Sequence, residues 1–119
     1  MQAATILFAH GSRDPLWSRP IDAVAQRMRE LDPHRLVRCA YLELMQPDLA
    51  SAVDELASVG AHAVTVVPMF LGVGRHARQD LPVLLAALAN SHPQITITLQ
   101  AAIGEDPRVL ELMARVALG

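Results

Sequence analysis

Apolar residues along the chain alternate between short continuous runs and longer stretches with helical spacing. The runs are partly β-branched and bounded by turn residues, which predicts four buried strands. Between and after them, apolar positions recur at the i, i+3, i+4, i+7 spacing of an amphipathic helix. The predicted strands are 4–9, 36–42, 63–69 and 95–99.

Proline, glycine and aspartate mark the ends of the predicted helices. The first helix carries apolar residues from Ile21 to Leu31 and ends before Pro33. The remaining boundary signals are Pro47 before the second helix, Gly60 after it, Asp80 as the N-cap of 81–90, and Asp106 with Pro107 at the start of the last helix. The apolar face of that last helix is Val109, Leu110, Met113, Val116 and Ala117.

The order of these elements predicts the fold class. Strands that alternate with helices indicate an α/β protein with a parallel sheet covered on both faces and joined by right-handed crossovers. We therefore expect one domain over 1–119, a three-layer α/β/α sandwich of flavodoxin-like type with a four-stranded parallel sheet.

Composition narrows the classes of function. The chain is 52% apolar with 3% aromatic residues, so its core must be built mainly from Ala, Leu, Val, Ile and Met. A net charge of −2 provides no general attraction for nucleic acid. Cys39 stands alone, which excludes an internal disulfide. The longest apolar stretch is too short for a bilayer and contains Pro68 and Gly72. We expect a soluble cytoplasmic protein without membrane or nucleic-acid partners.

Three residues with metal- or proton-binding side chains follow predicted strands. His10 ends the first strand, Glu43 follows the second, and His76 lies in a loop after the third. In open α/β sheets, ligands bind beyond the carboxyl ends of the strands. Each residue alone could be an ordinary turn histidine or surface carboxylate, but the fold predicts that the three converge. His34, His62 and His92 fall at the opposite edge and are interpreted as surface residues.

Two imidazoles and a carboxylate suit a borderline divalent metal such as cobalt, nickel, iron or zinc. All ten basic residues are arginines, and the lack of lysine excludes a Walker-type phosphate loop and a Schiff-base mechanism. Arg13, Arg75 and Arg78 flank the two histidines. Guanidinium groups bind carboxylates in a bidentate manner, so their grouping favours a polyanionic ligand.

The motifs at these strand ends resemble a known family. "AHGSR" after the first strand, "YLE…P" after the second, "VPMFLGVGRHARQDLP" after the third and "IGEDPRV" before the last helix are similar to the short class II tetrapyrrole chelatases, the CbiX-like sirohydrochlorin cobaltochelatases. The resemblance covers essentially the whole chain. Ala9 stands where the family commonly has glycine, and the histidine-rich tail of some relatives is absent from the sequence.

The resemblance implies a lyase that inserts a divalent metal, Co²⁺ or else Ni²⁺ or Fe²⁺, into sirohydrochlorin on a cobalamin or siroheme route. It implies no cofactor beyond that metal substrate. His10 is expected to act as catalytic base and metal ligand, His76 as metal ligand, and Glu43 to assist with metal or substrate. The remaining residues expected to contact the macrocycle are Ser12, Arg13, Phe70, Leu71, Gly72, Val73, Gly74 and Arg75.

Longer members of the family carry two copies of the fold around one cleft, so the resemblance also implies a homodimer for a chain of this length. Two other functions remain open at this point. A metal or tetrapyrrole carrier would use the same residues without turnover. A hydrolase would need a nucleophile, but the sequence has no G-x-S-x-G elbow, and Ser12 has no evident base–acid pair.

Overall fold

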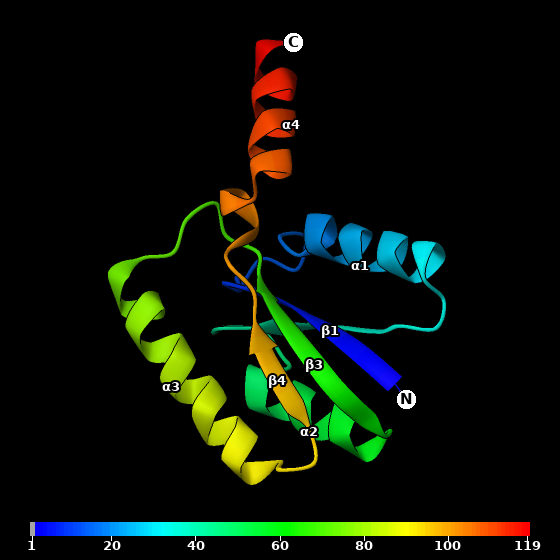
Figure 1. Cartoon of the computed structure of the whole chain (residues 1–119). Coiled ribbons are helices and arrows are strands. Elements are labelled where there is room, and N and C mark those ends of the chain that lie inside the picture. The colour runs from blue at the N-terminus through cyan, green and yellow to red at the C-terminus, as the bar shows by residue number, and fades with distance from the viewer. Residues whose placement is uncertain (1) are drawn as a thin grey trace.

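The structure, a computed structural model, describes residues 2–119 except for the side chain of His76. It confirms the predicted alternation of strands and helices and adds one short 3₁₀ turn (Figure 1). The elements are β1 Gln2–Ala9, α1 Arg19–Leu31, β2 Leu36–Tyr41, α2 Leu49–Ser58, β3 Ala61–Pro68, α3 Arg75–Ser91, β4 Thr96–Leu99, η1 Ile103–Glu105 and α4 Pro107–Leu118.

The four strands form one parallel sheet in the order β2-β1-β3-β4. β1 lies in the centre, where Ile6 is paired in register with Arg38 of β2 and Val66 of β3. Because all strands point the same way, the segments that follow them leave from the same edge of the sheet. This confirms the predicted α/β class and parallel sheet.

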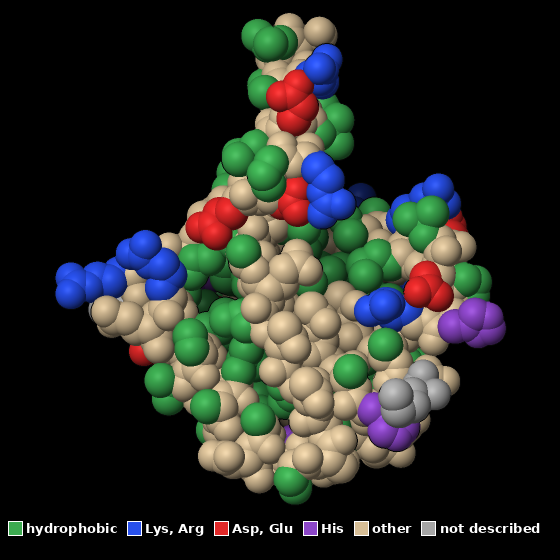
Figure 2. Space-filling view, in the orientation of Figure 1, with side chains coloured by type: hydrophobic (Ala, Val, Ile, Leu, Met, Phe, Trp, Pro, Cys, Tyr) green, Lys and Arg blue, Asp and Glu red, His purple; other side chains and the backbone are tan. Residues whose placement is uncertain are grey.

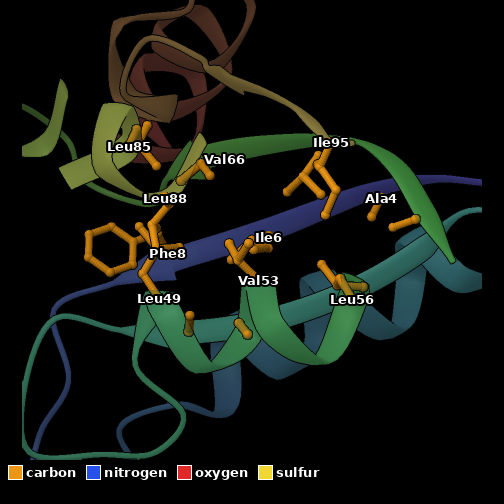
Figure 3. Packing of buried hydrophobic residues seen from close by; sticks show 14 of the residues in the cluster. Ala4, Ile6, Phe8, Leu49, Val53, Leu56, Val66, Leu85, Leu88 and Ile95 are labelled. Atoms are coloured by element: carbon orange, nitrogen blue, oxygen red, sulfur yellow. The ribbon is translucent and has the colours of Figure 1, made fainter. Parts of the chain in front are cut away.

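The main core lies between the sheet and the helices α2 and α3. Its centre is formed by Ile6, Val53, Leu56 and Val66, all completely buried (Figure 3). On β1 the residues facing this core alternate with residues facing the other side, as the pleat of a strand requires. The helix α2 begins after Asp48, whose carboxylate accepts a hydrogen bond from the backbone N–H of Ser51 at 2.8 Å.

The other face of the sheet carries a smaller core and is only partly covered. Leu7, Val37 and Val67 pack there against Ala25 of α1. Over β3 and β4 on this side, Ala63, Thr96 and Thr98 are exposed. The predicted full cover on both faces is therefore wrong for this half-face, because α4 projects away from the sheet and leaves it bare (Figure 1).

The start of α3 also differs from the prediction. The helix begins at Arg75 after Gly74, five residues before the predicted cap Asp80, and Pro82 lies inside it. An aspartate followed two residues later by a proline is typical of a helix start, but a helical backbone can contain a proline at the loss of one N–H hydrogen bond. His76 consequently lies in the first turn of α3 and not in a loop. In the part of the chain that the structure describes, no helix is both long and apolar enough to cross a bilayer.

Candidate active site

The segments after β1, β2 and β3 come together at the carboxyl edge of the sheet. The N–H of Glu43 donates to the carbonyl of His10 at 3.1 Å, which continues the pairing of β1 and β2 beyond the strands themselves. The N–H of Met69 donates to the carbonyl of Phe8 at 2.7 Å on the other side. The backbone at His10 is therefore held between its two neighbouring segments, as expected for a residue that directly follows the central strand.

Gly11 makes the close approach of these segments possible. Its φ is +97°, a conformation that residues with a side chain rarely adopt. A Cβ atom at this position would lie 1.8 Å from the carbonyl oxygen of Glu43. The glycine that follows His10 is therefore required by the backbone, and it brings the β1 and β2 segments into contact.

A cavity of about 720 Å³ opens at this edge. Its wall combines the end of β1, the segment after β3 and the first turns of α3. Most of the lining side chains are apolar, with an imidazole, a guanidinium and a carboxylate among them. The lining residues are Phe8, His10, Leu42, Phe70, Leu71, Gly72, Gly74, Arg75, Ala77, Asp80, Leu81 and Leu84. Such a mixture is typical of sites for an apolar ligand with a few fixed polar contacts.

Two phenylalanines orient the imidazole in this cavity. The ring of His10 meets the ring of Phe70 edge-on, with centroids 6.0 Å apart and an interplanar angle of 87°. Phe70 in turn contacts Phe8 at 6.2 Å and 68°. His10 itself is exposed, so one side of the imidazole rests on an aromatic ring and the rest is open to a ligand or to water.

The segment 70–74 is supported from below by η1. The N–H of Gly104 donates to the carbonyl of Phe70 at 3.0 Å. A Cβ on Gly104 would lie 2.2 Å from the carbonyl oxygen of Leu71, so only glycine permits this contact. The "IGEDP" motif therefore positions the cavity wall although it does not line the cavity.

The predicted site residues divide into two groups. His10, Phe70, Leu71, Gly72, Gly74 and Arg75 line the cavity. Glu43 is exposed and does not line it, although its backbone adjoins His10. Val73 lines a second, smaller hollow. The Ser12 hydroxyl accepts a hydrogen bond from the N–H of Asp14 at 3.0 Å, and Arg13 is exposed outside the cavity.

The pairing of His10 with His76 as metal ligands stays a prediction, because the side chain of His76 lies outside the described residues. Among the side chains that the structure does describe, no three histidines, cysteines or carboxylates lie together as a metal-binding group. The sequence interpretation missed six cavity residues: Phe8, Leu42, Ala77, Asp80, Leu81 and Leu84. Extending α3 back to Arg75 would have found three of them, since Ala77, Leu81 and Leu84 then share one helical face.

The histidines at the amino edge of the sheet lie away from the cavity, as predicted. His34 and His62 are exposed. The interpretation of His92 as a surface residue is wrong, because its side chain is largely buried and its Nε2 lies 2.7 Å from a carboxylate oxygen of Asp54, which links the end of α3 to α2. His92 therefore stabilises the packing of the two helices and does not contribute to the cavity.

Two other titratable groups, the Cys39 thiol and the Tyr41 hydroxyl, belong to β2 and do not line the cavity. Burial, with the nearby Asp22 carboxylate, raises the pKa of the Cys39 thiol, while Arg29 opposes the shift. Burial also raises the pKa of the Tyr41 hydroxyl, and Cys39 and Asp22 add to this effect. Both groups are therefore kept protonated at neutral pH.

Several known proteins are similar to this chain. The family model CbiX matches residues 4–117. A sirohydrochlorin cobaltochelatase from Methanopyrus kandleri is 33% identical over 68 residues, which cover 57% of this chain and 48% of that protein. One from Methanothermobacter thermautotrophicus is 32% identical over 66 residues. The matched region thus spans about half the length of these curated relatives.

Solved structures match nearly the whole chain. A CbiX protein assigned to cobalamin biosynthesis from Marinobacter aquaeolei is 36% identical with a TM-score of 0.83, covering 98% of this chain and 93% of that one. The sirohydrochlorin chelatase SirB from Bacillus subtilis, in complex with cobalt, is 25% identical with a TM-score of 0.82. That likeness covers 99% of this chain but 50% of SirB. From the family model and these likenesses together, the chain belongs to the CbiX family.

Proposed function

We propose that this protein inserts a divalent metal ion, most simply Co²⁺, into sirohydrochlorin. The observation that carries the proposal is the 720 Å³ cavity with the His10 imidazole in its wall, at the edge of a CbiX-type sheet. The similar proteins that carry the name sirohydrochlorin cobaltochelatase support this substrate and this metal. The binding of cobalt by the similar SirB supports it further.

The apolar wall suits the flat face of a macrocycle. Phe70 and Leu71 offer apolar surface to the cavity, and Leu71 is 72% exposed, so its side chain is accessible to a ligand. A Cβ on Gly72 or Gly74 would meet no atom of the protein within 4 Å. Their small size therefore leaves space on the ligand side, where the macrocycle would lie.

Arginines at the start of α3 would hold the carboxylates of the substrate. Arg75 lines the cavity and Arg78 is exposed one turn further along. Figure 2 shows basic side chains gathered over the start of α3. The beginning of a helix adds the partial positive charge of its free N–H groups. An anionic ligand at this position would thus meet both guanidinium groups and a favourable helix end.

The chemistry needs a base with a pKa near neutrality. When the metal ion enters the macrocycle, two pyrrole N–H bonds break, the four nitrogens bind the metal, and two protons leave. His10 would accept a proton at a ring nitrogen and release it to water, and the same imidazole would hold the incoming ion before transfer. His76 and Glu43 would serve as further ligands or proton acceptors. Weak binding by few side chains suits an ion that must be delivered and not retained.

Metal insertion can be measured directly. Purified protein would be mixed anaerobically with sirohydrochlorin and Co²⁺, Ni²⁺ or Fe²⁺ in parallel, and the absorption change followed over time. We expect insertion to be faster than in buffer for at least one metal, with the largest acceleration for Co²⁺. If the protein binds the macrocycle but insertion is no faster than in buffer, the protein is a carrier and not an enzyme.

Two histidine variants test the base. His10→Ala should reduce insertion to the rate in buffer, because it removes the imidazole from the cavity. His34→Ala is the matched control, since His34 is an exposed histidine at the opposite edge, and it should insert metal like the parent protein. Thermal unfolding of both variants checks the fold. Retained activity in His10→Ala would refute the assignment.

We also propose that two chains form the working unit. One copy provides a single wall beside an open edge, whereas the similar SirB has about twice the length and could enclose a ligand from two sides. A symmetric pair would place two equivalent cavity edges face to face.

A further inference from the structure

A carboxylate, that of Asp80, lies in the wall of the cavity. The sequence predicts this residue as the N-cap of α3, but the helix begins at Arg75 and its cap residue is Gly74. Asp80 therefore lies inside the helix and does not cap it. None of the ion pairs between described side chains involves Asp80. Its charge thus has no structural task among these contacts.

The helical spacing of α3 explains why Asp80 reaches the cavity. The helix starts near the carboxyl edge of the sheet and runs back along it (Figure 1). Ala77, three residues before Asp80, and Leu84, four residues after it, also line the cavity. Residues three or four apart share one face of a helix. A carboxylate thus lies between two apolar residues on the side of α3 that faces the cavity. In such a cavity the few polar groups act on the ligand.

Asp80 differs in chemistry from the other polar groups of the wall. The described side chains in the wall include one imidazole, that of His10 after β1, and one guanidinium, that of Arg75. Asp80 lies about 7.5 Å further along the axis of α3 than Arg75. The guanidinium suits a carboxylate of the ligand, whereas the Asp80 carboxylate repels such a group and can accept a proton. The two groups on α3 therefore serve different parts of one ligand.

We propose that Asp80 is a second proton acceptor in metal insertion and takes one of the two pyrrole protons of the macrocycle. The inference rests on the proposed function and adds a catalytic residue to it. As the ion binds, the pyrrole N–H bond breaks, and its electron pair stays on the nitrogen and binds the metal. The proton moves to a carboxylate oxygen of Asp80. Because Asp80 is exposed, the carboxyl group then releases the proton to water.

The imidazole of His10 cannot hold the ion and accept a proton at the same time. A neutral imidazole has one acceptor nitrogen, and its other nitrogen already carries a hydrogen. If the acceptor nitrogen binds the metal, no lone pair remains for a pyrrole proton. A second acceptor is therefore needed during the transfer. Asp80 lines the same cavity, whereas Glu43 does not line it.

Steady-state kinetics of metal insertion give the first test. Asp80→Asn keeps the size of the side chain but removes its basic oxygen, so kcat should fall roughly a hundredfold while KM for sirohydrochlorin and for Co²⁺ stays unchanged. Asp80→Glu retains a carboxylate and should recover most of kcat. Gln79→Ala is the control, because Gln79 is exposed on α3 and does not line the cavity, and it should behave like the parent protein. Thermal unfolding checks that each variant is folded.

Chemical rescue gives the second test. Asp80→Ala removes the carboxylate and leaves space for a small acid between Ala77 and Leu84. Added formate should raise the insertion rate of this variant with saturation, because formate supplies the missing proton acceptor. The same formate should leave the rates of the parent and of Gln79→Ala unchanged. Formate would not replace a residue that only supports the structure of α3.

The outcomes separate this role from the proposed activity. An inactive parent protein would refute the proposed function and this role with it. If the parent is active, an Asp80→Asn variant with parental kcat would refute the role of Asp80 alone, and the proton would then pass to water or to a carboxylate of the substrate. An increased KM for Co²⁺ with unchanged kcat would also refute it, since Asp80 would then hold the ion. A lack of rescue by formate in Asp80→Ala would likewise overturn the role.

Discussion

His10 and Gly11 are neighbours in the chain, but different constraints act on them. The backbone of His10 is fixed by its bond to Glu43, while its ring faces the cavity beside Phe70. Gly11 provides no chemistry and is required only because the backbone turns with positive φ against the carbonyl of Glu43. A short "HG" sequence thus combines one residue selected for its side chain with one selected for lacking it.

Gly11→Ala should therefore destabilise the protein. The new methyl group would overlap the Glu43 carbonyl, and the backbone would be held in a strained conformation. We expect the free energy of unfolding to fall by about 2 kcal/mol or more, measured by urea denaturation. Gly72→Ala is the control, because its methyl group would meet no protein atom within 4 Å, and it should change stability by less than about 1 kcal/mol. Equal stability of the two variants would contradict this account.

The site could be predicted from sequence where it depends on strand ends. A parallel sheet brings the residues after its strands to one edge, which was sufficient to place His10 and the 70–75 segment beside one cavity. Ser12, Arg13 and Glu43 were expected there too, but a short polar segment can turn in several ways, and spacing along the chain does not fix where its side chains point. Whether they contact the macrocycle remains a prediction.

Among the elements, α4 is the one whose start the sequence predicts best. Asp106 caps the helix through the Arg108 N–H, and Pro107 occupies the first turn, as their order indicates. Its amphipathic pattern was also correctly predicted. The pattern says which face is apolar but not which surface covers it, so the projecting position could not be foreseen. The predicted start of α3 was too late, because Asp80 and Pro82 form a pattern typical of a helix start although they lie inside a helix that begins at Arg75.

The Asp106 cap should give the stability of the protein a distinct acid dependence. Its contacts with Arg108, first through the side chain and then through the backbone N–H, lower the pKa of the carboxyl from 3.8 to about 2. A lowered pKa means that the folded state favours the carboxylate. The cap therefore stabilises the protein fully above about pH 4, and this contribution is lost as the pH falls toward 2.

A comparison of the parent with Asp106→Ala can measure this contribution. Urea unfolding at several pH values should show a constant difference in stability between pH 5 and 7 and a shrinking difference below about pH 4. Arg108→Ala removes the largest cause of the pKa shift and should move the loss to higher pH. A difference that is the same at pH 3 and pH 6 would show that the carboxylate charge of Asp106 does not contribute.

On the scale of the whole molecule, two surfaces of one chain remain uncovered. The cavity is open at the carboxyl edge, and the β3–β4 half-face is bare beside it. The half-face is bare because α4 extends away from the sheet (Figure 1). If a second copy closes the cavity, as proposed above, the formation of the pair and the formation of the enclosed site are one event.

The rate of metal insertion per chain should then depend on protein concentration. Dilution below the dissociation constant of the pair separates the chains and opens the cavity to water, so the activity per chain should fall in proportion to the dimer fraction. The dimer fraction would be measured by light scattering or sedimentation over the same concentrations. Constant activity per chain across the dissociation would mean that one copy is sufficient for metal insertion, and that the partner contributes stability alone.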